Sequence, residues 1–373
     1  MSIKSSILFL LAVLLSLDSL SQPNRFGVPI ITNYEHYITG GSEQNWSITQ
    51  DTRGVMYFGN QDKGVLEYDG VTWRSIPITN NSAVRSLVIG DDNVVYVGAV
   101  EEFGYLVPDC YGNMYYKSLI NRIPVPDTVY TGFSDVWKTY YSRDTVYFCS
   151  RSYIFKYAPL ADSIQIVTLP KNALFSFNLG ADIYTCSYGE GIMKLNYDHF
   201  ITIPGGDFFR EKNVSGMCEI DSSKILVATF FQGLFTLDRK TGEVDDRFVS
   251  EGVNNYLKSG QVVYLQDLNQ AFMIADLYNG ITIIGRNGQA LEIITEAEGL
   301  HDQQVPYVYS NKLLKDSAPV WIANFQGISK IETNNPFRVF TEKSGFDGFI
   351  SDIKYFNQRL YISTSTGLYY KNS

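Results

Sequence analysis

The chain has 373 residues, a length that suits two ordinary domains or one large β architecture. Hydrophobic residues make up 45% of it and charged residues 18%, which excludes a largely disordered chain. The formal net charge of −9 argues against a nucleic-acid partner, which needs a positive face, while 27 Tyr, 23 Phe and 30 Gly favour strands joined by tight turns.

The first residues have the pattern of a secretory signal. Lys4 precedes an apolar run over residues 7–17, and small residues over 19–21 match the positions that a signal peptidase reads. A membrane anchor is the weaker interpretation, because a spanning helix needs about 20 apolar residues. We therefore expect residues 1–21 to be a cleaved signal peptide and residues 22–373 to form an exported domain without a membrane span.

A short pattern returns eight times along the rest of the chain, about every 40 to 50 residues. Each copy has a leading strand, a turn, and an apolar or aromatic pair followed by one small residue; a loop and a further apolar stretch come next. The third leading strand is expected near residues 135–137, and fourth, outer strands near 72–76 and 337–340. The small residues are Gly59, Gly98, Cys149, Cys186, Ala228, Ala275, Ala323 and Ser363.

This order of elements is that of a propeller blade with four antiparallel strands. The sequence therefore predicts an all-β fold, a β-propeller. We expect each small residue to face a large aromatic side chain of the next blade, because inner strands crowd toward the axis. After the signal, no helical pattern longer than two turns is convincing.

The number of blades stays open at this point. The eighth module stops after its third strand, at Tyr370, and the stretch 30–34 is suited to supply a missing outer strand. That exchange would close an eight-bladed ring and remove exposed sheet edges. The other arrangement is a seven-bladed ring followed by the start of a further structure.

Three segments resemble the two-component regulator propeller repeat, namely residues 44–51, 54–60 and 64–73 (QNWSITQD, GVMYFGN and GVLEYDGVTW). Residues 84–106 and 321–328 extend the resemblance, which is close over 44–106 and loose over 25–373. It implies the N-terminal periplasmic sensor region of hybrid two-component receptors of Gram-negative bacteria.

In that family two seven-bladed propellers precede a triple-tyrosine domain, a transmembrane helix and an output domain. The resemblance therefore implies seven blades plus the start of a second ring, with the signalling output domain as a partner outside this chain. It also implies a homodimer in the full receptor, because signalling across a membrane usually needs a pair of chains. An isolated propeller would instead be monomeric.

Residues with catalytic or metal-binding chemistry are scattered. We interpret Asp198 and His199 as a surface pair in a loop between modules, and Glu101 and Glu102 as a solvated loop. The four cysteines lack the spacing of a zinc or redox site. An exported chain permits disulfides, but small buried residues are the favoured interpretation of Cys149 and Cys186. We expect no catalytic residue, no metal and no cofactor.

The loops between the second and third strands of all blades are expected to share one face with the starts of the inner strands. They mix aromatic rings with amides and carboxylates, which suits a small molecule or oligosaccharide, because rings cover the apolar face of a sugar and polar groups bond its hydroxyls. For any single residue, packing between blades is the competing interpretation. The candidate ligand-binding residues are Asn60, Gln61, Glu102, Arg151, Tyr188, Glu190, Phe231, Gln232, Tyr278, Asn279, Asn324 and Gln326.

Three functions are compatible with these patterns. The favoured one is a non-catalytic sensor, in the periplasm or outside the cell, that recognises an extracellular signal such as a glycan fragment. The second is an enzyme on a propeller scaffold, a polysaccharide lyase or glycosidase, since propellers host many chemistries. The third is a scaffold that binds a partner protein. A sensor predicts ligand-dependent thermal stabilisation without product, whereas an enzyme predicts turnover.

Overall fold

The computed structural model describes residues 27–124, 132–311, 318–333, 335, 337–340, 346–357 and 359–372. The signal peptide expected over residues 1–21 lies outside these ranges. The chain divides into two compact units: Ile31–Glu296 with Leu300–Asn334, and Met1–Ile30 with Ala297–Gly299 and Asn335–Ser373. Within the described ranges, no helix has the length and apolar content needed to cross a membrane.

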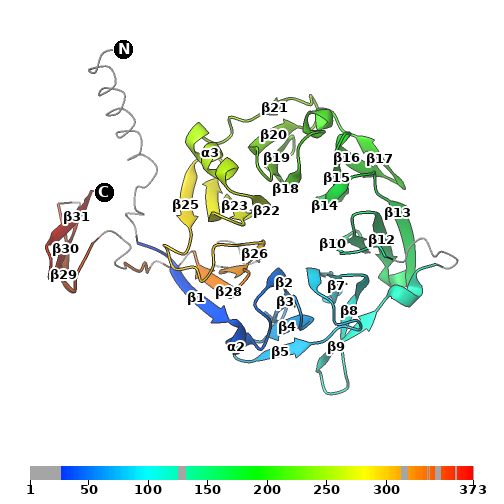
Figure 1. Cartoon of the computed structure of the whole chain (residues 1–373), viewed down its shortest axis with the longest axis horizontal. Helices are drawn as coiled ribbons and strands as arrows, with labels where there is room; N and C mark the ends of the chain where they lie inside the picture. Colours follow the sequence, from blue (N-terminus) through cyan, green and yellow to red (C-terminus); the bar gives the residue numbers. More distant parts are fainter. Residues whose placement is uncertain are drawn as a thin grey trace, which may run out of the picture. The chain divides into compact units, whose positions relative to one another are not determined.

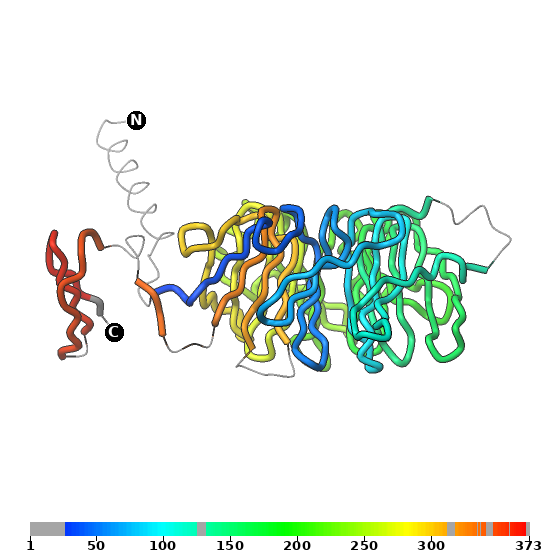
Figure 2. The backbone as a smooth tube through the Cα atoms, turned by 90° about the horizontal axis from the view of Figure 1, so that it is seen from below, coloured from blue at the N-terminus to red at the C-terminus, as the bar shows by residue number. Residues whose placement is uncertain are grey.

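The larger unit is a propeller. In its described part, seven four-stranded sheets surround a common axis, which Figure 1 views end-on. Seen from its edge, this ring is a disc whose strands run between two faces (Figure 2). Neighbouring strands pair antiparallel, as in the first blade. The predicted all-β propeller of four-stranded blades is thus confirmed.

Blades 1 to 6 are each built from four consecutive strands, ordered from the axis outward. They are β2 (Asn45–Gln50), β3 (Met56–Asn60), β4 (Val65–Tyr68) and β5 (Trp73–Ile76); β6 (Val84–Ile89), β7 (Val95–Ala99), β8 (Glu102–Pro108) and β9 (Met114–Ser118); β10 (Lys138–Ser142), β11 (Thr145–Cys149), β12 (Tyr153–Ala158) and β13 (Ser163–Thr168); β14 (Ala173–Leu179), β15 (Asp182–Ser187), β16 (Gly191–Asn196) and β17 (His199–Thr202); β18 (Val214–Glu219), β19 (Lys224–Thr229), β20 (Gly233–Asp238) and β21 (Val244–Asp245); β22 (Val262–Asp267), β23 (Ala271–Asp276), β24 (Gly280–Gly285) and β25 (Ala290–Ile294).

Blade 7 closes the ring by strand exchange. It consists of β26 (Tyr307–Ser310), β27 (Val320–Ala323) and β28 (Gly327–Glu332), with β1 (Ile30–Glu35) from the start of the chain as its outer strand. The Ser329 hydroxyl donates a 2.7 Å hydrogen bond to Asn33 Oδ1 across this pair. The Tyr34 ring lies 5.8 Å from that of Trp321 in blade 7 and 5.4 Å from that of Trp73 in blade 1. The exchange expected for residues 30–34 is therefore present, but it completes a seventh blade.

Two expectations about the end of the repeat are wrong. Residues 337–340 are not an outer strand of blade 7, because β1 occupies that position; Val339 forms only an isolated bridge with Val28. The eighth module is not a blade of the ring. Its strands β29 (Ile350–Phe356), β30 (Arg359–Thr364) and β31 (Leu368–Asn372) form a three-stranded antiparallel sheet in the smaller unit. The ring thus has seven blades, as the family resemblance implies.

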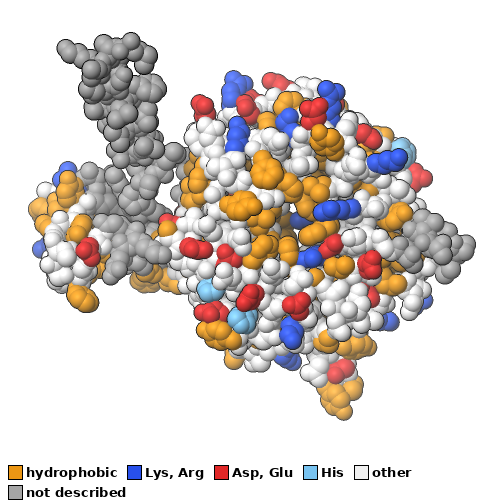
Figure 3. Space-filling model, viewed as in Figure 1, with side chains coloured by type: hydrophobic (Ala, Val, Ile, Leu, Met, Phe, Trp, Pro, Cys, Tyr) orange, Lys and Arg blue, Asp and Glu red, His pale blue; other side chains and the backbone are white. Residues whose placement is uncertain are grey.

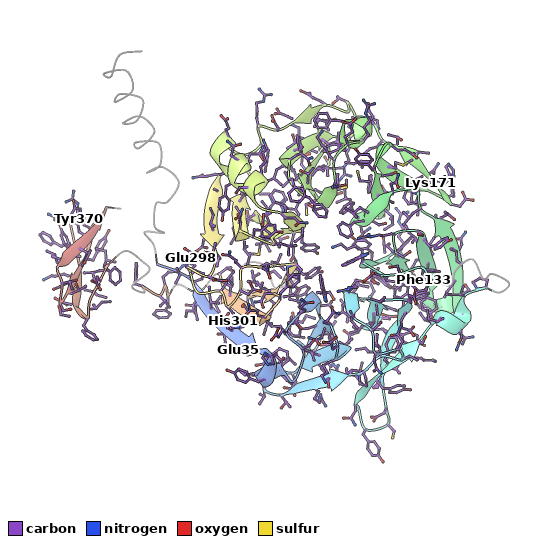
Figure 4. All side chains as sticks on the ribbon, viewed as in Figure 1. Glu35, Phe133, Lys171, Glu298, His301 and Tyr370 are labelled. Atoms are coloured by element: carbon purple, nitrogen blue, oxygen red, sulfur yellow. The ribbon has the colours of Figure 1, made fainter. Side chains whose placement is uncertain are left out.

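The hydrophobic core lies between blades. In the described chain, each of seven clusters of buried apolar residues joins two neighbouring blades. Phe133, labelled in Figure 4, lies away from the ring axis and contacts Phe103 and Phe155 at centroid distances of 5.8 and 4.9 Å. Each sheet therefore buries its apolar faces against the next one, which a single blade does not achieve alone.

The small residues serve this packing, although in a different way than expected. A Cβ atom on Gly59 would lie 2.7 Å from the carbonyl oxygen of Val84, on the inner strand of the next blade. On Gly98 it would lie 2.6 Å from Val136 Cγ1. The expected aromatic neighbour is wrong at these two positions, because Gly59 faces the inner strand β6 and Gly98 faces Val136 in the segment before β10.

The cysteines are free thiols: Cys149, Cys186 and Cys218 are buried and Cys110 is exposed. Burial raises the pKa of Cys149 and of Cys186 to about 12, which keeps both thiols neutral at ordinary pH. Their interpretation as small buried residues is confirmed.

Helical segments are short. They are α2 (His36–Thr39), η1 (Ile120–Arg122), η2 (Pro159–Ala161), η3 (Gly206–Phe209) and α3 (Glu251–Ser259). The nine residues of α3 make about two and a half turns, so the expectation of no helix beyond two turns is wrong. Ser250 caps it by accepting a hydrogen bond from the Val253 N–H, and Asn254 ties it to blade 5 by accepting one from the Leu234 N–H at 2.9 Å.

Candidate ligand-binding face at the ring axis

Irregular pairing recurs near the start of the inner strands. In blades 1, 2, 4, 5 and 6 the register between the first and second strands shifts at this point. Such a bulge re-aims the extra side chain. The residues at the shifts include Trp46, Arg85, Phe175, Ser215 and Val263.

Five aromatic rings from five different blades meet here, and we call them the aromatic girdle. In sequence around the ring they are Phe325, Trp46, Trp137, Phe175 and Phe230, and successive centroids lie 5.1, 6.0, 6.0 and 6.1 Å apart. All five side chains are half-buried. Partly exposed, immobilised rings of this kind provide flat apolar surfaces for a ligand.

An arginine is fixed between two of these rings. The Arg85 guanidinium carbon lies 4.2 Å from the centroid of Trp46 and 5.0 Å from that of Trp137. Arg85 Nε donates to Asp135 Oδ1 at 2.7 Å, and these side chains are only 14% and 18% exposed. Gln61 Oε1 accepts from Arg85 Nη1 at 3.1 Å and from Trp46 Nε1 at 2.9 Å. These contacts hold the guanidinium in one orientation before any ligand arrives.

The third inner strand begins later than expected. Residues 135–137 precede β10, and Asp135 makes only an isolated bridge with Val100. The Val136 N–H donates to the Ala99 carbonyl, and Ser86 Oγ donates to the Val136 carbonyl at 2.7 Å. The segment is thus bonded to blade 2, which brings Asp135 to Arg85 and Trp137 into the girdle.

Two candidate asparagines are buried and hold loops in place. Asn60 Nδ2 donates to the carbonyls of Ser42 and Gln44 and to Asn45 Oδ1. Asn324 Nδ2 donates to Ser329 Oγ. Both side chains are fully buried, so the structure gives them a role in shaping the face.

Glu102 is also buried, and its interpretation as a solvated loop residue is wrong, because it is the first residue of β8 and points inward. Its carboxylate accepts from Ser118 Oγ at 2.7 Å, from Tyr116 Oη at 3.0 Å and from the Phe103 N–H at 2.9 Å. Burial raises the pKa of Glu102, against the opposing effect of these hydrogen bonds.

The remaining candidates lie in the expected loops. Gln61 contacts the girdle, because its Oε1 accepts a hydrogen bond from Trp46 Nε1. Arg151 also contacts the girdle, with its guanidinium carbon 5.7 Å from the Trp137 centroid. Asn279 is half-buried and donates to the Tyr256 carbonyl of α3. The side chains of the other six are exposed, and a binding role for them stays a prediction; they are Tyr188, Glu190, Phe231, Gln232, Tyr278 and Gln326.

Several residues of this face were missed in the candidate set, above all Arg85, Trp137 and Phe175. They stand at the starts of inner strands, where a strand pattern marks them as core. The sequence signal that could have identified them is an aromatic residue or an arginine at the same position relative to the inner strand in several modules. Figure 3 views the ring along its axis and shows basic side chains among hydrophobic ones around the centre.

Asp198 and His199 form an exposed contact of 3.1 Å between Oδ1 and Nδ1, which confirms a surface pair. The pair lies in the hairpin between β16 and β17, within blade 4, and its placement between modules is wrong. Across the described residues, no group of three or more His, Cys, Asp or Glu side chains is arranged to hold a metal ion.

No family profile matches the sequence, and no curated protein matches it. Solved structures do. The extracellular domain of the putative hybrid two component system BT3049 from B. thetaiotaomicron has a TM-score of 0.66 and 16% identity over 92% of this chain. That of BT4673 from the same organism has a TM-score of 0.60 and 16% identity over 92% of this chain. This chain spans about half of each, 48% and 46%.

Propellers with other roles are also similar. Virginiamycin B lyase from Staphylococcus aureus has a TM-score of 0.59 and 12% identity over 81% of this chain. The match covers 99% of the lyase chain. At such identities the likeness establishes the propeller fold. The two-component domains among these structures agree with the family that the repeat pattern resembles.

Proposed function

We propose that this chain is the non-catalytic sensor propeller of a two-component-type signalling receptor. It acts in the periplasm or outside the cell and binds an extracellular signal, such as a glycan fragment, at the aromatic girdle. The observation that carries this proposal is the row of five half-buried rings, two of which, Trp46 and Trp137, flank a pre-oriented Arg85. The similarity to extracellular domains of hybrid two-component systems supports it.

The chemistry of the girdle matches a sugar. A pyranose ring has apolar C–H faces that pack on aromatic planes, while its hydroxyls need donors and acceptors. Arg85 and Gln61 together offer donors and acceptors. Hydrogen bonds with Asp135 and Trp46 hold these two side chains in place. Because these groups are ordered in advance, less conformational entropy is lost on binding.

Thermal unfolding of the purified protein against a panel of oligosaccharides tests the proposal. A ligand present at about 100 times its Kd adds about 2.7 kcal/mol to the free energy of unfolding and raises Tm by several degrees. Trp137→Ala should abolish that shift. Tyr111→Ala is the matched control, because Tyr111 is an exposed aromatic in the turn between β8 and β9.

Product analysis of the same mixtures distinguishes the alternatives. Cleaved oligosaccharide would contradict a sensor and favour the lyase or glycosidase. If no oligosaccharide of the panel changes the Tm of a normally folded protein, this result would contradict ligand binding at the girdle and favour a protein partner.

The smaller unit supports a longer receptor. Every residue of β29 is exposed, and the apolar side chains of Ile353, Tyr355 and Phe356 are among them. A three-stranded sheet buries little by itself, so we propose that it begins a second ring. The solved two-component domains are about twice as long as this chain, in line with that reading. In the full receptor we expect a homodimer coupled to an output domain.

A further inference from the structure

A cavity lies among the inner strands of blades 3 to 6, next to the girdle. Its volume is ≈ 180 Å³, room for several water molecules. The side chains that matter for its chemistry are Lys138, Ser215, Tyr264, Gln266 and Asp267. Phe175 connects the two regions, because it contacts Trp137 of the girdle at 6.0 Å and lies 5.5 Å from Lys138 Nζ.

Lys138 supplies an unpaired positive charge to this cavity. It is the first residue of β10, directly after Trp137, and its Nζ lies 4.5 Å from the Tyr264 centroid and 5.9 Å from that of Tyr307. Nowhere in the described chain does a carboxylate pair with this ammonium or an oxygen accept a hydrogen bond from it. In a protein with a net charge of −9, an ammonium left without a carboxylate is unusual.

The acidic residue in the cavity wall does not fill that role. Asp267 lines the same cavity, but its carboxylate pairs with Arg286. Burial lowers the pKa of Lys138 to about 8, with no opposing contribution from a nearby anion. Because this pKa is still above 7, the cavity holds a cation at neutral pH, without a counter-charge among the described residues.

Other polar atoms beside Lys138 also lack partners. Ser215 Oγ, at the bulge of β18, and Gln266 Oε1 are buried in the cavity wall without a hydrogen bond among the described residues. Trp137 Nε1, in the preceding residue, is likewise buried and unbonded. Buried polar groups without hydrogen bonds are rare in proteins and destabilise the free state. An oxyanion in the cavity would give the Lys138 ammonium a counter-charge and the Ser215 hydroxyl an acceptor.

We infer that this cavity receives an oxyanion, a carboxylate or sulfate group, of the ligand that rests on the girdle, and that Lys138 is its counter-charge. The inference rests on the proposed function and narrows the ligand to acidic saccharides. Gln266 Oε1 accepts from a ligand hydroxyl beside the anionic group. Charge-assisted hydrogen bonds are about twice as strong as neutral ones, so Lys138 selects acidic over neutral ligands.

Glucuronate and glucose are the probes, because they share a ring and differ in the carboxylate. We expect glucuronate to raise the pKa of Lys138 from about 8 toward its ordinary value, read from the ¹³Cε signal of lysine-labelled protein, and glucose to leave it unchanged. Lys138→Met identifies that signal and should weaken glucuronate binding about tenfold or more. Lys171→Met is the control, since Lys171 is exposed and lies away from the axis (Figure 4).

Equal responses to both sugars, or unchanged glucuronate binding by Lys138→Met, would overturn the inference. Inorganic sulfate is tested alone; if it moves the Lys138 signal while glucuronate does not, the cavity takes a free anion and the inference also fails. These failures leave the proposed function intact as long as a neutral oligosaccharide still stabilises the protein and Trp137→Ala abolishes that effect. If no oligosaccharide binds at the girdle while glucuronate still shifts the Lys138 signal, the result would instead contradict the proposed function alone.

Discussion

Replacing Lys138 by methionine should make this protein more stable. Burial without a counter-charge lowers the pKa of Lys138 from 10.5 to about 8. Since each pKa unit corresponds to 1.36 kcal/mol, holding the ammonium protonated in the fold at pH 7 opposes folding by about 3 kcal/mol. Methionine has a similar length and suits the apolar contacts with Phe175, Tyr264 and Tyr307. Lys138→Met should therefore raise Tm at pH 7 by several degrees.

The pH dependence gives this prediction its sign. The pKa of Lys138 is lower in the folded than in the unfolded protein, so the unfolded chain binds more protons between about pH 8 and 10.5. The lysine's contribution to wild-type stability therefore rises with pH through that window. The Lys138→Met protein lacks this pH-dependent contribution. The difference in free energy of unfolding between the variant and wild type should therefore shrink toward zero above about pH 10.5.

Thermal or urea unfolding at several pH values between 6 and 11 measures both effects. Lys171→Met, which removes an exposed lysine, should change stability by less than about 0.5 kcal/mol at every pH. A Lys138→Met protein that is less stable than wild type at pH 7, or a difference that does not vary with pH, would refute the reasoning. Higher stability combined with weaker glucuronate binding would show that the residue is kept for binding.

Three further changes test the architecture. Tyr34→Ala removes the half-buried ring that joins β1 to Trp321, and should lower the free energy of unfolding by about 2–3 kcal/mol in urea titrations. Gly59→Ala should destabilise by about 1–3 kcal/mol, because its Cβ would meet the next blade, whereas Gly252→Ala in α3 should stabilise by up to about 1 kcal/mol. Glu102→Gln should remove the loss of stability that wild type shows as pH rises through the raised pKa of Glu102.

Each of these has a contrary outcome. Unchanged stability of Tyr34→Ala would mean that β1 does not close the ring. Similar effects of the two glycine changes would mean that Gly59 has room for a side chain. If Glu102→Gln keeps the wild-type pH profile, another group is responsible for it.

The blades were predictable because their pattern is local. A strand pair, one small residue and a turn recur within about 40 to 50 residues, and each copy makes the same contacts with its neighbour. Ring closure was not local. The strands at residues 350–372 have the same pattern as a blade, and only the long-range pairing of residues 30–35 with β28 decides that the seventh sheet is complete without them.

The site was predictable only in outline. The loops were expected on one face, and Gln61 and Arg151 do reach the girdle. Trp46 and Arg85 escaped because alternation assigns them to a strand, and a bulge that adds one residue leaves no mark in the pattern. Trp137 escaped because its segment precedes β10 and is bonded to blade 2, a long-range contact that the pattern does not show. Lys138 escaped for another reason. In the sequence, a lysine at the start of a strand has the pattern of a solvent-exposed strand end. In the fold, side chains from blades 4 to 7 surround it, and these lie far away in the sequence.

Tryptophan fluorescence tests the central claim most directly, because two of the four tryptophans, Trp46 and Trp137, stand in the girdle, while Trp73 and Trp321 stand at the closure of the ring. Titration with an oligosaccharide that raises the Tm of wild type should change the emission of wild type and of Trp73→Phe alike, and the change should vanish in a protein with both Trp46→Phe and Trp137→Phe. A change that persists in that double variant would place the ligand elsewhere and contradict the account.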